Sequence, residues 1–338
     1  MIVPRLAACA ALISALAAPS LAADAPLLTP QAAVVVPGGP GGFDWMLVDA
    51  PRHRLLASHP GKNTLVVLDL KTNAVQQIPT GVEINGIAVD EADNKLFTAG
   101  GGQKVIVFDN TTLTKTGEIP LTGPGDDIVL DTKRDRLYVC HDDGAEDWVF
   151  NAKDNTLTGT VAIAGAPEYV AYDPGTDRLY QNVKPANVTQ VIDPATNKVV
   201  ATWPTAPMTS PHGLAVNPKT HHVFSAGQGK VVMMDQNTGK VLSSVSIAPG
   251  YVDQIAFDPG NGRLYCACGD AGVISVVGES EAGIALLGNV PSHHKSHTLA
   301  VDPDTHAVWI SYSDAGNGCL QQFTLPKDSQ LDKKQAAR

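Results

Sequence analysis

The chain has 338 residues, of which 17% are charged and 5% are aromatic, whereas glycine and proline are abundant at 31 and 24 residues. This composition is typical of many short strands joined by tight turns, and it argues against long helices. The formal net charge of −10 repels nucleic acid phosphates, and no cluster of Lys and Arg offsets it, so we exclude nucleic acid as a partner.

The first 22 residues have the features of a secretory signal. Arg5 supplies a positive charge, residues 6–18 are apolar, and residues 20–22 are small enough to precede a cleavage site. Cys9 precedes most of the apolar stretch, which argues against a lipoprotein signal. We predict cleavage near Ala22 and export to a bacterial periplasm or the medium. No later apolar run is long enough to span a membrane.

After this segment, one apolar strand ending in Asp or Asn recurs seven times, at residues 45–49, 86–90, 127–131, 169–173, 213–217, 254–258 and 298–302. The copies are 41 to 44 residues apart, and each is followed by further short apolar runs. Four strands per unit at this period indicate propeller blades. We predict an all-β, seven-bladed β-propeller with four-stranded blades. The Asp at the end of each strand is predicted to cap a turn, which is a structural role.

The two ends of the repeat array are complementary. The seventh copy lacks a fourth strand, and residues 32–36 lie in the register of a fourth strand before the first copy. We therefore predict that the N-terminal strand completes the C-terminal blade and closes the ring. The propeller then occupies residues 23–326, a solvated tail follows at 327–338, and the closed ring is expected to be a monomer.

Four cysteines follow the predicted cleavage site: Cys140, Cys266, Cys268 and Cys319. Disulfides are stable in an oxidising compartment, but Cys266 and Cys268 face the same side of one strand, which is poor geometry for a bond between them. We expect buried thiols with at most one bridge, whose pairing the sequence leaves open. No haem, nucleotide or flavin signature occurs.

The position four residues before the last apolar residue of each recurring strand is polar in all seven copies. We call these residues the polar ring: Asp44, Asn85, Asp126, Glu168, His212, Asp253 and His297. Repeat symmetry places them at equivalent points around one axis. Strand starts often carry polar residues for structural reasons alone. Six carboxylate or imidazole groups around one axis, however, create a repulsion that a cation or cationic partner would relieve.

The polar ring divides into two arcs by chemistry. Asp44, His212, Asp253 and His297 come from neighbouring blades and form the predicted metal site, because two imidazoles and two carboxylates suit Zn²⁺. The other arc comprises Asn85, Asp126 and Glu168. Its oxygen atoms suit Ca²⁺ or Mg²⁺, or the hydroxyl groups of a bound ligand.

Loops after the second strand of each unit are expected on the same face as the polar ring. His59, His141 and Cys268 occupy matching places in three of these loops. We predict that His59 and His141 contact a ligand at the rim. His293 and His294 lead into His297 and are expected beside the same opening.

Two functions fit these residues. The first is a metal-assisted lactonase, hydrolase or lyase, in which the metal polarises a carbonyl or activates water and His212 or His297 acts as general base. No Gly-x-Ser-x-Gly motif supports a serine nucleophile. The alternative is a non-catalytic propeller that binds a small molecule, a glycan or a protein at the channel mouth.

The repeats resemble those of the YVTN-repeat propellers, including the YncE type of the bacterial periplasm. Units such as residues 191–199 (VIDPATNKV) and 258–265 (DPGNGRLY) carry the resemblance, which spans nearly all of the mature chain. It implies a seven-bladed fold and a periplasmic location. It leaves the function open, because this group includes binding proteins and similar folds include lactonases and lyases.

Overall fold

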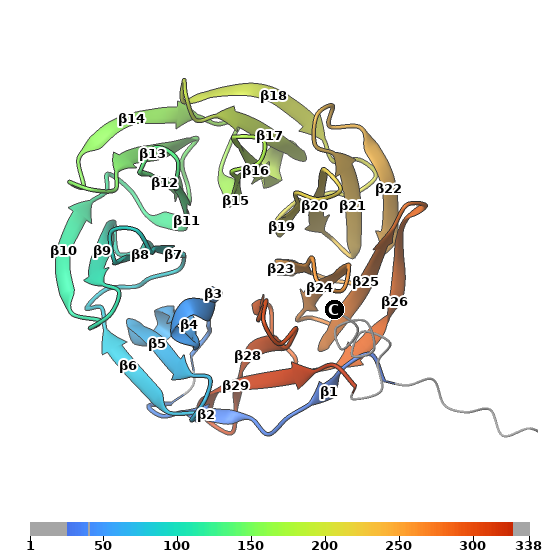
Figure 1. Ribbon diagram of the computed structural model, residues 1–338, viewed down its shortest axis with the longest axis horizontal. Coiled ribbons are helices and arrows are strands. Elements are labelled where there is room, and N and C mark those ends of the chain that lie inside the picture. The colour runs from blue at the N-terminus through green and yellow to red at the C-terminus, as the bar shows by residue number, and fades with distance from the viewer. Residues whose placement is uncertain (1–25, 40, 327–338) are drawn as a thin grey trace, which may run out of the picture.

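Seven antiparallel sheets stand around one axis like the blades of a propeller (Figure 1). This computed structural model describes residues 26–39 and 41–326, so the predicted signal at 1–22 and the predicted tail at 327–338 lie outside the described residues. The predicted all-β fold of seven four-stranded blades is confirmed. Within the described ranges, no helix is long and apolar enough to cross a membrane.

Each blade runs outward from the axis through successive strands. The innermost strands are β3 (Met46–Asp49), β7 (Ile87–Asp90), β11 (Gly125–Asp131), β15 (Pro167–Asp173), β19 (Leu214–Asn217), β23 (Val252–Asp258) and β27 (Leu299–Val301). The second strands are β4 (Arg54–His59), β8 (Lys95–Thr98), β12 (Arg136–His141), β16 (Arg178–Val183), β20 (His222–Gly227), β24 (Arg263–Cys268) and β28 (Val308–Asp314).

The outer half of each blade continues this order. The third strands are β5 (Thr64–Asp69), β9 (Lys104–Asp109), β13 (Glu146–Asn151), β17 (Val188–Asp193), β21 (Lys230–Asp235), β25 (Val273–Ser280) and β29 (Asn317–Thr324). The outermost strands of the first six blades are β6 (Val75–Pro79), β10 (Lys115–Pro120), β14 (Leu157–Ala162), β18 (Lys198–Pro204), β22 (Val241–Ser246) and β26 (Gly283–Pro291). Short 3₁₀ turns are η1 (Ala50–Arg52), η2 (Pro60–Lys62) and η3 (Lys184–Ala186).

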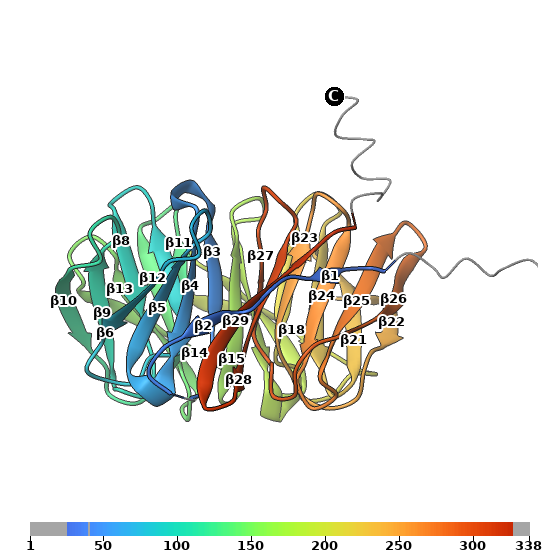
Figure 2. The ribbon, with the colours of Figure 1, turned by 90° about the horizontal axis from the view of Figure 1, so that it is seen from below.

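The seventh blade is built from both ends of the described chain. Two N-terminal strands, β1 (Thr29–Pro30) and β2 (Val34–Val36), pair antiparallel with β29 at its outer edge. Figure 2 shows this N-terminal segment running across the outside of β29. The glycine-rich segment after β2 then leads to β3 of blade 1, so blades 7 and 1 are covalently continuous at this point.

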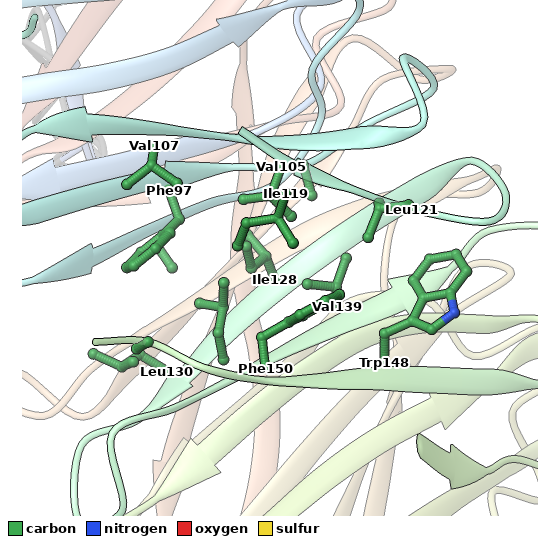
Figure 3. Close-up of a cluster of buried hydrophobic side chains, with 14 residues drawn as sticks. Phe97, Val105, Val107, Ile119, Leu121, Ile128, Leu130, Val139, Trp148 and Phe150 are labelled. Atoms are coloured by element: carbon green, nitrogen blue, oxygen red, sulfur yellow. The ribbon is translucent and has the colours of Figure 1, made fainter. Parts of the chain in front are cut away.

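The hydrophobic core consists of layers between neighbouring blades. One such layer joins blades 2 and 3, where Phe97 and Val107 face Ile128, Val139 and other apolar side chains (Figure 3). Phe97 and Val139 are fully buried. A single four-stranded sheet cannot bury both of its faces alone, so each blade is stabilised by its two neighbours.

Six of the seven residues that end the recurring strand cap turns, as predicted, whereas Asp49 instead pairs with Arg54. At the end of the third strand β5, Asp69 Oδ1 likewise accepts hydrogen bonds from the backbone N–H groups of Lys71 and Thr72 at 2.9 and 2.8 Å. Asp258 accepts one from Gly260 at 2.8 Å. These bonds favour the ionised carboxylate, and the backbone donor of Thr72 is the largest cause that lowers the pKa of Asp69. The caps are therefore structural and leave the polar ring as the candidate site.

All four predicted cysteines are buried and free, with no disulfide in the described ranges. Burial is the largest cause that raises the pKa of the Cys266 thiol. The prediction of buried thiols is confirmed, and these side chains fill space between strands.

Neighbouring innermost strands approach closely beside the polar ring. A Cβ atom added to Gly86 would lie 2.7 Å from the Asp126 carbonyl oxygen and 2.8 Å from the Ile128 nitrogen. Both neighbours are backbone atoms of blade 3, which cannot rotate away. Only glycine fits here without moving one blade against the next.

We predict that Gly86→Ala destabilises the protein by about 1–3 kcal/mol, because overpacking at fixed backbone forces two blades apart. Chemical denaturation measures the change. The matched control is Gly159→Ala in β14, where the nearest atom to an added Cβ is Asn197 Nδ2 at 3.7 Å. Equal stability of the two variants would contradict the close approach.

Candidate functional site

The polar ring lies where the innermost strands begin. Asp126, Glu168 and Asp253 are the second residues of β11, β15 and β23, and the other four residues each precede their strand by two positions. All seven side chains are partly exposed. The structure therefore gathers them at one end of the axis, within reach of solvent.

Four residues of the polar ring form one continuous line of ion pairs. His212 Nε2 lies 2.5 Å from Glu168 Oε2, and His212 Nδ1 lies 2.8 Å from Asp253 Oδ1. The other oxygen of Asp253 lies 2.5 Å from His297 Nδ1. Carboxylates and imidazoles alternate along this line across blades 4, 5, 6 and 7. We call it the relay.

The electrostatics of the relay favour protonated histidines. Burial lowers the pKa of His212, but the charge and hydrogen bond of Asp253, together with Glu168, outweigh it and raise the pKa to about 10. For His297, burial likewise lowers the pKa, while Asp253 and Asp44 raise it, with a net increase. Burial raises the pKa of Asp253, but His212 and His297 hold it well below its usual range. At neutral pH His212 is thus an imidazolium paired with the carboxylate of Asp253.

The remaining carboxyl groups of the polar ring are pushed in the opposite direction. Burial, followed by the charges of Asp253 and Asp126, raises the pKa of Asp44 to about 8. Burial also raises the pKa of Asp126 to about 6, although Asn85 Nδ2 donates a hydrogen bond to it at 3.1 Å. Asp44 is therefore mainly protonated at neutral pH, and Asp126 is mainly ionised.

Three further side chains join the site. The hydroxyl of Tyr251 hydrogen-bonds to His212 and lies 3.4 Å from Asp253 Oδ1. Lys184 Nζ lies 3.3 Å from Glu168 Oε1 and 5.2 Å from the centre of the Tyr251 ring. Burial and then the charge of Glu168 raise the pKa of Asp142. Sequence reasoning missed Tyr251, although it lies two residues before Asp253 and so on the same side of the strand.

The two histidines predicted at the rim pack against aromatic rings. His59 is fully buried and stacks on Phe43 with ring centres 4.3 Å apart, so it does not reach dissolved ligand in this conformation. Burial lowers its pKa. His141 stacks on Trp148 at 4.3 Å, with Nε2 3.2 Å from Asp143 Oδ1. It is partly exposed at the edge of the site.

An aromatic pair lies one residue deeper along the strands. Trp45 and Tyr169, which follow Asp44 and Glu168, come from blades 1 and 4, and their ring centres are 4.6 Å apart. They also border an apolar pocket of about 420 Å³ between the innermost strands. The polar ring thus lies at the mouth of the central channel, next to an apolar interior.

Three of the four residues predicted to bind metal, His212, Asp253 and His297, are arranged as ion pairs with one another. Within residues 26–39 and 41–326, no group of three or more His, Cys, Asp and Glu side chains is placed to hold a metal ion. Metal binding requires an unprotonated imidazole, whereas both nitrogens of His212 face carboxylate oxygens and its pKa is raised. The metal site predicted from the sequence is therefore not supported in this arrangement. The histidines of the relay themselves offset the repulsion among the carboxylates of the polar ring, so this repulsion does not require a bound cation.

No family model and no curated protein sequence matches the chain. Solved structures are similar in fold. They include the RRP9 WD40 repeats (TM-score 0.74, 10% identity, 88% of this chain and 100% of that chain) and a chain of a mitotic checkpoint complex (0.75, 16%, 93% and 100%). Another is a chain of Kuenenia stuttgartiensis hydrazine synthase (0.73, 15%, 83% and 95%). At these identities the similarity shows a WD40-like seven-bladed fold only, and it gives no specific support to the YVTN-repeat resemblance.

Proposed function

We propose that the polar ring is the active site of an acid–base enzyme that acts on a small molecule bound at the channel mouth. The reaction class is hydrolysis of an ester or lactone, or elimination beside a carboxylate. The relay of Glu168, His212, Asp253 and His297 carries the proposal, because it holds ionised and protonated groups side by side where solvent reaches them. Sites with pKa values pushed apart are typical of acid–base catalysis.

The charges of the polar ring divide the roles. Asp126, with a pKa of about 6, is the candidate base that takes a proton from water or from a carbon beside a carboxylate. Asp44, with a pKa of about 8, is the candidate acid that protonates the leaving oxygen. The sequence pattern predicts His212 or His297 as the general base. Their raised pKa values instead favour imidazolium groups that stabilise negative charge on a substrate oxygen.

Turnover assays test this proposal. A panel of lactones, aryl esters and uronides is offered to the wild type, to His297→Gln and to Asp44→Asn. The matched control is His222→Gln, because His222 pairs with Glu279 Oε1 at 2.5 Å but lies on β20, after the hairpin at the other end of the innermost strand. We expect kcat to fall at least 100-fold in both ring variants, with the control unchanged.

The same assays separate a metal-assisted reaction from the proposed one. We expect activity to survive dialysis against EDTA. Loss of activity that Zn²⁺, Ca²⁺ or Mg²⁺ restores would instead favour the metal-assisted lactonase, hydrolase or lyase. Full activity in both ring variants would exclude the polar ring from catalysis.

The second candidate is a non-catalytic propeller that binds a small molecule, glycan or protein at the same mouth. Its support is that both nitrogens of His212 already lie within ion-pair distance of Glu168 and Asp253. The structural neighbours include a chain of a checkpoint complex and a chain of hydrazine synthase, so they favour neither function. Binding without turnover, lost in His297→Gln, would support this candidate.

We also propose that the protein is exported and belongs with the YVTN-repeat propellers. The signal-like residues 1–22 and the repeat units support both statements. Osmotic-shock fractionation of cells that express the full chain tests export. A mature N-terminus near Ala23 in the periplasmic fraction supports it, and an uncleaved cytoplasmic product contradicts it.

A further inference from the structure

A cleft of about 330 Å³ opens beside the polar ring at the junction of blades 7 and 1. Its wall comprises Gly41, Gly42, Phe43, His294, Lys295, His297, Ser311, Tyr312 and Ser313. His297 belongs to both the cleft and the relay. Its side chain is 29% exposed, compared with 12% for His212 and 16% for Asp253, so it is the accessible end of the relay.

The charge of the cleft is opposite to that of the polar ring. Its wall contains one lysine, two histidines and no carboxylate. Among the described residues, no carboxylate lies within 4.0 Å of Lys295 Nζ, whereas Lys184 on the other arc is paired with Glu168. The cleft therefore places unneutralised positive charge next to the proposed acid–base groups.

The walls of the cleft are held in place by contacts of their own. Ser313 Oγ donates a hydrogen bond to the Gly41 carbonyl at 2.8 Å, which ties the glycine-rich segment to blade 7. The Lys295 N–H bonds to the Gly269 carbonyl at 2.9 Å. His293 stacks on Tyr312 with ring centres 3.5 Å apart. A ligand thus meets a preformed site and does not have to order it.

The glycine-rich segment is open at one residue of the cleft. A Cβ atom added to Gly42 would find no atom within 4 Å, whereas one added to Gly41 would lie 2.5 Å from His59 Nε2. A carboxylate accepts hydrogen bonds from backbone N–H groups as well as from ammonium and imidazolium donors. Ser313 is the exposed polar residue of the wall besides His294 and Lys295, whereas Ser311 is buried and hydrogen-bonded to Thr298.

We propose that this cleft binds the carboxylate of an organic-acid substrate, with Lys295 as the principal charged contact and the reacting carbon held over the polar ring beside His297. This inference rests on the proposed function and names its substrate class. A pocket of about 330 Å³ is at the small end of the range for ligand sites and suits a molecule the size of a sugar acid.

Equilibrium binding tests the cleft without requiring turnover. Isothermal titration calorimetry at low salt compares acetate, glycolate and glucuronate with uncharged acetamide and glucose. We expect at least one acid to bind at least tenfold more tightly than its uncharged counterpart. Lys295→Gln is expected to weaken that binding at least fivefold. Lys240→Gln is the control, because Lys240 is exposed in the turn before β22.

The outcomes distinguish this inference from the proposed function. Equal binding of acids and uncharged counterparts, or unchanged acid binding in Lys295→Gln, would overturn the proposed carboxylate site. Neither result would affect the proposed function, which the turnover assays on His297 and Asp44 test separately. Tighter binding of inorganic phosphate than of any carboxylate also overturns the carboxylate site and assigns the cleft to a phosphoryl group. If acid binding depends on Lys295 but no substrate is turned over, the carboxylate site is supported and only the proposed catalytic function is contradicted.

Discussion

Replacing Asp253 by Asn is expected to break the relay at its centre. His212 and His297 would then share a partly buried space without the carboxylate that faces both of them. Removal of one partner from a buried ion pair leaves an uncompensated charge, so we expect the free energy of unfolding at pH 7 to fall by about 3 kcal/mol. The pKa of His212, about 10 in the wild type, is expected to fall toward or below 6.5, as NMR titration of the imidazole nitrogens would show.

The pH dependence of stability provides a second readout. Because the pKa of His212 is raised above its unfolded value of about 6.5, the native state binds more protons than the unfolded state between pH 6.5 and about 10. The stabilisation from His212 is thus complete below pH 6.5 and is lost as pH rises toward 10. Asp253→Asn should remove this loss. If the pKa of His212 is the same in Asp253→Asn as in the wild type, Asp253 is not the cause of the raised pKa.

The fold could be predicted because the same strand pattern recurs, so an ambiguous assignment in one copy is resolved by the other copies. No single strand such as 86–90 identifies a propeller, but seven copies at 41 to 44 residues leave few other architectures. The same register placed Asp44, Asp126 and Asp253 at equivalent positions. The positions of residues that repeat in the sequence can therefore be predicted from the sequence alone.

Residues that occur in one blade only could not be found in this way. Tyr251 and Lys295 both lie two positions before a member of the polar ring, and the equivalent residue in blade 1 is Gly42. Because the residue type at this position differs from blade to blade, the repeat pattern does not mark it as part of a site. Their importance follows from contacts across blades, such as the hydrogen bond between Tyr251 and His212.

The charge state of the polar ring also could not be predicted from the sequence. Two imidazoles and two carboxylates have the composition of a zinc site, and only distances show that His212 and His297 face carboxylate oxygens. The predicted exposure of His59 failed for a related reason. Its loop position matched that of His141, but Phe43, from the segment that leads into blade 1, covers it.

Replacing Asp147 by Asn is expected to stabilise the protein at alkaline pH. Asp147 on β13 is fully buried, its Oδ1 accepts a hydrogen bond from Gln181 Nε2 at 2.9 Å, and its Oδ2 has no hydrogen-bond partner. Burial raises its pKa to about 7, so the native state retains a proton that the unfolded chain loses above about pH 4.

The sign of this effect follows from proton linkage. Between pH 4 and 7 the native state binds the extra proton, so the stability of the wild type falls as pH rises, by on the order of 4 kcal/mol for this group. Asn keeps the acceptor for Gln181 and carries no charge. The variant should match the wild type near pH 4 and exceed it at pH 8 in urea denaturation. Asp304→Asn, at an exposed turn position after β27, should show no such difference. A gain that is equal at both pH values would mean that Asp147 does not titrate in this range.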